Sequence, residues 1–351
     1  AVETTMFFTF FFGIFASVVG FILVPQMLKF MKTPEDVMEQ AIIYLRIYFS
    51  GMSGLMVYNM GSGVLRAVGD TKRPLYFLTC VVTAVLVLLF LIVLDLGVAG
   101  VAIATIIAQF ISAVLVLRLL IKANDIYYFS FKDLRCEWSI LKDVFLIGLP
   151  SGIQSVLTAF SNVFVQAYIN FFGSAAIAGW SCYNKLHTFI MLPMQSMSHA
   201  AATFVGQNVG AKKIDRVNRG TIETLLITMS ITAFIATILY IFAEPATRLF
   251  IKDTDVIEFS ALLISTNIFF LILNSVNHPL AGALRGRGDS TAPMIIMLST
   301  FVGVRQLYLY VLTTYFVNEP QLVGFSYPVG WTVCFVVEVT YLYFRWLRKK
   351  Q

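Results

Sequence analysis

The feature that most constrains this chain is a series of long apolar stretches separated by short polar breaks. A helix needs about 20 mostly apolar residues to cross the hydrocarbon core of a bilayer. Ten stretches reach that length: 5–31, 35–65, 74–94, 98–121, 143–171, 176–206, 218–242, 255–284, 292–316 and 322–346. Charged residues make up only 13% of the 351 residues, which is about half the share found in soluble domains. The sequence therefore predicts an all-α polytopic membrane protein.

The basic residues are distributed unevenly between the two ends of these predicted helices. Of the 25 Lys and Arg residues, 18 lie at one set of ends, 4 at the opposite set and 3 inside the spans. Cytoplasmic loops of membrane proteins carry an excess of Lys and Arg. We therefore expect a multi-pass protein of the cell's inner membrane whose basic loops and C-terminus are cytoplasmic. The same bias explains the net charge of +6 without a nucleic-acid partner.

The two halves of the chain contain related motifs. Residues 65–71 (LRAVGDT) return 219 positions later as residues 284–290 (LRGRGDS), and Pro74 returns as Pro293. Internal repeats of this kind are typical of transporters. The repeat predicts two pseudo-symmetric helical bundles: a first lobe over 1–121 and a second lobe over 143–351. A cytoplasmic linker over 122–142 would join them.

The repeat also leaves part of the second lobe unmatched. The 78 residues 143–220 have no counterpart in the first half. A first lobe of equal size would need two more helices upstream, so we expect a chain truncated at its N-terminus. The alternative is a natural ten-helix protein.

Four motifs together resemble the multidrug and toxic compound extrusion (MATE) family. They are residues 65–74, their second copy at 284–293, Gly148-Leu149-Pro150, and the FVGQNVGA segment at 204–211. The resemblance implies a twelve-helix fold, of which ten helices are present, with two six-helix bundles around a cavity that opens alternately to each side. It also implies exchange of cationic drugs or metabolites for Na⁺ or H⁺.

The repeated motif itself is interpreted as structural. Glycine permits the left-handed turn that ends a helix, and aspartate can cap the helix that follows. We expect these residues to shape the loops between helices rather than to bind substrate: Arg66, Gly69, Asp70, Arg285, Gly288 and Asp289.

Among the ionisable residues inside the predicted spans, four are candidates for ion coupling, because such residues are costly in a bilayer. Glu338 is either a proton or cation carrier, or the partner of Arg305 or Lys185 in a structural ion pair. Lys185 and Arg305 either attract an anionic or zwitterionic substrate, or hold helices together. His278 either titrates near neutrality or is buried and neutral.

The chain departs from the family at its coupling acids. Some relatives place acids in the seventh and tenth family helices, where this chain has Gln154, Asn274 and Asn277. Amides can ligate Na⁺ through oxygen but cannot carry a proton. A coupling mechanism through that acid pair is therefore not expected here.

A substrate cavity would be lined by polar, aromatic and methionine side chains, which suit a promiscuous apolar cation. The alternative for each is hydrogen bonding between helices. The candidates are Tyr48, Met56, Tyr58 and Asn59 in the first lobe, and Gln154, Asn162, Gln166, Tyr183, Asn184, Met194, Gln195, Asn267, Asn274 and Asn277 in the second.

These observations favour a secondary transporter that exports small amphipathic organic cations in exchange for H⁺ or Na⁺. We expect a monomer with no cofactor. The four scattered cysteines and three histidines predict neither a disulfide nor a metal site, and no catalytic motif indicates an enzyme. The alternative is a lipid-linked saccharide flippase of the same superfamily, although only Lys185 and Arg305 are available to bind its pyrophosphate.

Overall fold

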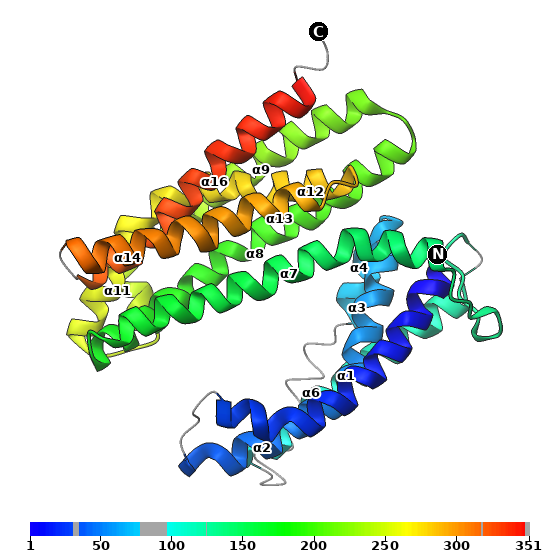
Figure 1. Ribbon diagram of the computed structural model, residues 1–351, viewed down its shortest axis with the longest axis horizontal. Coiled ribbons are helices and arrows are strands. Elements are labelled where there is room, and N and C mark those ends of the chain that lie inside the picture. The colour runs from blue at the N-terminus through cyan, green and yellow to red at the C-terminus, as the bar shows by residue number, and fades with distance from the viewer. Residues whose placement is uncertain (31–34, 78–96, 124, 317–318, 348–351) are drawn as a thin grey trace. The chain divides into compact units, whose positions relative to one another are not determined.

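The computed structural model describes residues 1–30, 35–77, 97–123, 125–316 and 319–347, and these residues form helices joined by short turns (Figure 1). Seven helical runs are long and apolar enough to cross a membrane: Val2–Phe30, Gly97–Ile121, Trp138–Asn170, Ile214–Ile241, Thr254–Gly286, Thr291–Tyr315 and Pro320–Arg345. An eighth consists of α2 (Glu35–Ser50) and α3 (Met52–Ala67), which are bent by 46°. The prediction of an all-α polytopic membrane protein is confirmed.

The two remaining predicted spans have different outcomes. Span 176–206 is one helix, α8 (Ser174–Gly210), of 37 residues, but it is too polar to qualify as a span by composition alone. Several of its polar side chains, including Tyr183, Ser198 and Asn208, are buried against other helices instead of facing lipid. Span 74–94 lies almost entirely outside the described residues; only its first turns, in α4 (Lys72–Phe77), are seen.

The chain divides into two compact units, Ala1–Val144 and Phe145–Gln351. The first contains α1 (Val2–Phe30), α2, α3, α4 and α6 (Gly97–Ile121). The bend between α2 and α3 falls at Gly51, where a β-carbon would lie 2.5 Å from the Ile106 side chain of α6. A larger residue at position 51 would fit only if the Ile106 side chain moved.

The segment predicted as a linker, 122–142, packs onto the first unit. Phe129 is fully buried in the core that Met6, Leu65 and Leu120 form, and its amide donates to the Leu120 carbonyl at 3.1 Å. The short 3₁₀ helix Phe131–Asp133 follows. The next helix, α7 (Trp138–Asn170), begins before residue 143 and contains the boundary between the two units.

The second unit is built around α8 and α12 (Leu271–Gly286), which pack closely through small residues. A β-carbon on Gly286 would lie 2.5 Å from the Ala202 carbonyl oxygen, so glycine is required there. Small residues at such contacts let membrane helices approach each other. Around this pair lie α9 (Ile214–Ile241), α10 (Ala243–Arg248), α11 (Thr254–Asn267) and α15 (Pro320–Gly324).

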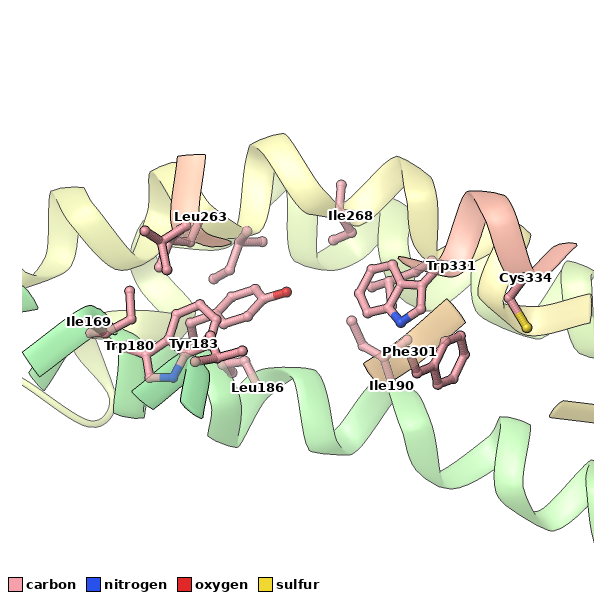
Figure 2. Close-up of a cluster of buried hydrophobic side chains, with 14 of the residues drawn as sticks. Ile169, Trp180, Tyr183, Leu186, Ile190, Leu263, Ile268, Phe301, Trp331 and Cys334 are labelled. Atoms are coloured by element: carbon pink, nitrogen blue, oxygen red, sulfur yellow. The ribbon is translucent and has the colours of Figure 1, made fainter. Parts of the chain in front are cut away.

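Two helices of the second unit depart from regular α geometry at their centres. The 3₁₀ turn η3 (Ile268–Phe270) joins α11 to α12, and the π-helical turn η4 (Ser299–Val304) joins α13 (Thr291–Leu298) to α14 (Arg305–Tyr315). A second π turn, η5 (Tyr343–Leu347), follows α16 (Ser326–Leu342). Such turns inside helices frequently mark functional sites. Figure 2 shows the apolar core between these helices, with Trp180, Tyr183 and Trp331 among its members.

Candidate functional site

The two copies of the repeated motif have the same backbone structure. The amide of Asp70 donates to the Leu65 carbonyl, and that of Asp289 donates to the Leu284 carbonyl. The amides of Gly69 and Gly288 donate to the carbonyls of Arg66 and Arg285, and both glycines have positive φ, +91° and +84°. This is the Schellman motif, which satisfies the last carbonyls of a helix.

Each aspartate then caps the helix that follows. Asp70 accepts from the Arg73 amide, and Asp289 accepts from the Ala292 amide, both at 3.1 Å. The second copy has one further bond, because the Tyr341 hydroxyl donates to Asp289 at 2.6 Å. These bonds agree with a structural role for the motif in both units.

The arginines of the two motifs have different surroundings. Arg66 is exposed, whereas Arg285 is half-buried and donates through Nη2 to Oε1 of Gln154 on α7 at 3.1 Å. Its Nε is buried and has no hydrogen-bond partner in the described part of the chain. Arg285 therefore lies at the edge of the bundle interior.

Glu338 on α16 is fully buried, and neither carboxylate oxygen has a hydrogen-bond partner among the described residues. The expected alternative of an ion pair with Arg305 or Lys185 is not seen. All three ion pairs found in the described ranges lie at the surface: Arg73–Asp70, Arg219–Glu223 and Arg248–Glu244. The basic group that interacts electrostatically with Glu338 is Arg285, which is not within ion-pair distance.

Arg305, the first residue after the π turn η4, is 3% exposed. Its Nη2 donates to the Ser161 hydroxyl on α7, and its guanidinium lies 4.7 Å from the centre of the Tyr327 ring on α16. Gln306 donates to the same serine hydroxyl at 3.0 Å. Arg305 therefore connects α7, α14 and α16.

Lys185 and two half-buried histidines lie on α8 and α12. Lys185 is exposed, and its Nζ is 5.5 Å from the centre of the Phe250 ring. The backbone carbonyl of His278 accepts from Ser198 at 2.6 Å, while its Nε2 is buried without a partner in the described chain. His187, which the sequence analysis missed, also has a buried Nε2 without a partner in the described chain. Its ring stacks on the Trp331 ring, with 5.5 Å between the ring centres. Its place inside a predicted span was the signal that could have identified it.

The first-unit candidates for a substrate cavity do not share one environment. Tyr58 is buried in the core and donates to the Pro74 carbonyl at 2.9 Å. Tyr48 stacks on Tyr44, Met56 is half-buried, and Asn59 is exposed. Tyr58 thus makes an internal packing and hydrogen-bonding contact, whereas Asn59 faces outward from the helices.

The second-unit candidates fall into two groups. Those buried inside the bundle are Gln154, Tyr183, Met194, Asn267, Asn274 and Asn277. Those with exposed or half-exposed side chains are Asn162, Gln166, Asn184 and Gln195. In the outer group, Asn162 accepts from the Tyr327 hydroxyl at 3.2 Å, and Gln166 donates to Asn170 at 2.8 Å.

The buried amides make few good hydrogen bonds. Gln154 donates to the Met297 sulfur at 2.9 Å and Asn274 to the Met191 sulfur at 3.4 Å, and sulfur is a weak acceptor. Asn277 donates to the Trp331 carbonyl at 3.1 Å. The described residues contain no cluster of three or more His, Cys, Asp or Glu side chains that could hold a metal ion.

A polytopic bundle of apolar helices with ionisable groups in its interior is an architecture that membrane transporters use. The sequence profile of the MatE family matches residues 1–91 and 150–311. The chain belongs to this family of transporters. It is therefore a transporter and not an enzyme.

Individual relatives agree with this assignment. The chain is 30% identical over 333 residues to the probable multidrug resistance protein YpnP of Bacillus subtilis (strain 168), covering 94% of this chain and 74% of that protein. It is 26% identical over 360 residues to the probable multidrug resistance protein YoeA of the same organism, covering 99% of this chain and 77% of the relative. The chain thus spans about three quarters of the length of these relatives.

Solved structures share the fold at low sequence identity. A MOP superfamily transporter from Pyrococcus furiosus Vc1 (DSM3638) matches with a TM-score of 0.93 at 19% identity, over 100% of this chain and 79% of that one. A multidrug resistance MATE family transporter in an outward-facing conformation matches with a TM-score of 0.91, over 98% and 78%. The family assignment makes small molecules the substrates of this membrane protein.

Proposed function

We propose that this MATE-type efflux transporter is a secondary antiporter that exports small amphipathic organic cations in exchange for protons. It acts as a monomer by alternating access in the inner membrane, with its C-terminus in the cytoplasm. The names of the Bacillus relatives, both multidrug resistance proteins, support the substrate class. The bias of Lys and Arg towards one set of helix ends supports the orientation.

Glu338 carries the proposal for proton coupling. Its carboxyl group is fully buried in a membrane-crossing helix, and neither oxygen has a hydrogen-bond partner in the described ranges. An isolated carboxylate anion is very costly in such surroundings, and the neutral acid costs far less. Uptake of a proton by Glu338 would therefore stabilise one arrangement of the helices, and its release another.

Arg285 is the proposed partner of Glu338 in its charged form. The two groups already interact electrostatically, and Gln154 currently holds one amino group of Arg285. A small movement that brings Arg285 to Glu338 would compensate the carboxylate after deprotonation. Gln154, Asn274 and Asn277 are amides and cannot take over this role.

Residues 1–121 and 143–351 are proposed as the two lobes of the transporter, with 122–142 joining them. The division of the chain into two compact units and the matching helix caps at Gly69 and Gly288 support this arrangement. The exposed polar group of the second unit, Asn162, Gln166, Asn184 and Gln195, is the better candidate for substrate contact, because its side chains are not enclosed by the bundle.

A flippase for lipid-linked saccharides is the weaker candidate. It would need several free basic groups for a pyrophosphate. Arg305 is instead held by Ser161 and Tyr327, and Lys185 lies over Phe250.

The proposal can be tested in everted membrane vesicles that contain the protein. An inside-acid pH gradient should drive uptake of the cationic dye ethidium, and nigericin, which collapses that gradient, should abolish uptake. A Na⁺ gradient without a pH gradient should have no effect. Uptake driven by Na⁺ alone would assign the other coupling ion, and no gradient-dependent uptake of any cationic dye would refute the antiporter.

The role of Glu338 is tested by Glu338→Gln, which keeps the shape of the side chain but cannot carry a proton. We expect transport to fall much more than the amount of protein in the membrane. Glu223→Gln is the matched control, because Glu223 lies at the surface in an ion pair with Arg219. Unchanged transport in Glu338→Gln would remove this residue from the mechanism.

A further inference from the structure

Buried polar atoms without hydrogen-bond partners are concentrated along the centre of the second unit. They come from α8, α11, α12 and α16, and each lacks a hydrogen bond of good geometry among the residues that the structure describes, although the side chains of Tyr183 and Asn267 interact with each other. Eight of these side chains are linked by the contacts described below: Tyr183, His187, Asn267, Asn274, Asn277, His278, Arg285 and Glu338; Ser326 on α16 has such an atom too but is not among them. We refer to these eight side chains as the polar column.

Contacts between the helices order the column from one end to the other. Tyr183 lies next to Asn267, and the His187 ring is 5.7 Å from the Tyr183 ring. The Trp331 ring stacks on the His187 ring, and the Trp331 backbone carbonyl accepts a hydrogen bond from the Asn277 side chain. The column therefore starts at Tyr183 and Asn267 and continues through His187 to Asn277.

The remaining members extend the column to Glu338. Asn274 lies against Met191, one turn beyond His187 on α8. Ser198, further along α8, donates to the His278 carbonyl. His278 interacts electrostatically with both His187 and Arg285, and Arg285 with Glu338. Along α8 the stretch from Tyr183 to Ser198 corresponds to about 22 Å at 1.5 Å per residue.

A small cavity lies at the end of the column opposite to Glu338. Tyr183 and His187 line it together with apolar residues such as Ile190 and Ile268, and its volume of about 10 Å³ is close to the minimum that holds one water molecule. In Figure 2 the Tyr183 hydroxyl points away from Trp180, towards the part of the core that contains Trp331.

The energetics favour hydration of the whole column. A buried polar group without a partner costs about 1–3 kcal/mol, and such groups are rare in folded proteins. Several neighbouring buried atoms in this condition, in helices otherwise packed with apolar residues, would be costly without bridging water. Histidine exchanges protons near neutral pH, and chains of His and acidic residues in membranes mark proton routes.

We infer that the polar column is a hydrated proton route through the second unit, which connects Glu338 with the end of the bundle at Tyr183 and Asn267. This inference rests on the proposed role of Glu338 as the proton carrier and adds the path by which its proton arrives. The side chains of His187 and His278 pass protons through bridging water. Tyr183 and the three asparagines position that water.

The charged groups around the column fit this role. Arg285 interacts electrostatically with both His278 and Glu338. Arg305 on α14 is directed to Ser161 and Tyr327, and Lys185 on α8 is exposed over Phe250. Within the described ranges, Arg285 is thus the cation of the column, and it lies at the Glu338 end.

The test uses two variants that remove only the polar atoms. Tyr183→Phe and His187→Phe keep the aromatic stacking with each other and with Trp331. The matched control is Tyr308→Phe, which also removes a tyrosine hydroxyl of the second unit, but one that donates to the Leu322 carbonyl outside the column. The purified protein in lipid is transferred to D₂O at a pH low enough for the protonated carboxyl band of Glu338 to be present.

The infrared carboxyl band that is absent in Glu338→Gln belongs to this residue. After transfer to D₂O the band shifts as the carboxyl proton is replaced by deuterium, and the rate of that shift measures how fast exchange reaches Glu338. We expect the exchange to be slowed in Tyr183→Phe and in His187→Phe, but not in Tyr308→Phe. Exchange as fast as in the wild type in either column variant would overturn the route.

A transport assay separates this inference from the proposed function. Both column variants should lose ethidium uptake driven by a pH gradient, yet keep exchange of ethidium against ethidium at equal pH, which needs no net proton movement. If ethidium uptake by the wild-type protein does not depend on the pH gradient, the proposed antiport is refuted. The rates of hydrogen–deuterium exchange at Glu338 in the wild type and the column variants still decide whether the route exists.

Discussion

The backbone of Gly282 on α12 lies so close to the Ser198 carbonyl of α8 that a β-carbon at residue 282 would collide with that oxygen. The same two residues are linked to the polar column, because Ser198 also donates to the carbonyl of His278, one turn before Gly282. The packing of α8 on α12 therefore sets the spacing of the side chains that lie between them.

Gly282→Ala should destabilise the protein by about 1–3 kcal/mol, because overpacking at a contact between two backbones cannot be relieved by a side-chain rotation. The measurement is thermal unfolding in detergent. Gly206→Ala is the matched control at the same helix pair, since a β-carbon there would lie 3.6 Å from the Gly286 carbonyl, an ordinary contact. Equal stability of the two variants would contradict the described packing.

Lys212→Gly should stabilise the protein by about 1 kcal/mol. Lys212 ends α8 in the left-handed region, with φ of +58°, and its amide donates to the Val209 carbonyl as in the two glycine caps. A side chain is strained in this conformation, whereas glycine is not. The complementary change Gly288→Ala should destabilise the protein, and a melting temperature that moves in the same direction in both variants would refute the cap.

Arg305→Lys should destabilise the protein by about 1–3 kcal/mol, because lysine cannot reproduce the planar contact with Tyr327 while donating to Ser161. Unfolding in detergent measures the loss. Arg248→Lys is the control, since Arg248 is exposed and its contact with Glu244 is a surface ion pair at 3.9 Å. If Arg305→Lys were as mild as the control, the connection of α7, α14 and α16 through Arg305 would not be important for stability.

Asp289→Ala should cost more stability than Asp70→Ala. Both changes remove a helix cap, worth about 1 kcal/mol. Only Asp289 also accepts from the Tyr341 hydroxyl, and so attaches the end of α16 to the loop before α13. Tyr341→Phe should therefore cause part of the loss seen in Asp289→Ala and should cause little further loss when combined with it. Additive losses in the double variant would contradict this shared bond.

The sequence predicted the local features that depend on short segments. Long apolar stretches predicted the helices, and the motif at Gly69 and Gly288 predicted two helix ends of the same kind, because only glycine readily adopts the left-handed conformation there. These features follow from chemistry within a few residues.

Features that depend on packing between distant segments could not be predicted. Arg66 and Arg285 occupy the same place in the repeat, but only Arg285 meets an amide from another helix, Gln154. The π turn η4 shifts the face on which Arg305 lies, so regular helical spacing could not show that its partners are Ser161 and Tyr327. Nor could the sequence of α16 show that Glu338 lacks a hydrogen-bond partner in the described chain, because this depends on the helices packed around it.

The most direct test of proton coupling through Glu338 is a measurement of proton movement itself. Proteoliposomes with the pH-sensitive dye pyranine inside receive ethidium outside, in the absence of any other gradient. The lumen should become more alkaline as ethidium enters and protons leave, and Glu338→Gln should show no such change while it still binds ethidium. An equal pH change in Glu338→Gln, or none in the wild-type protein, would contradict coupling through this residue.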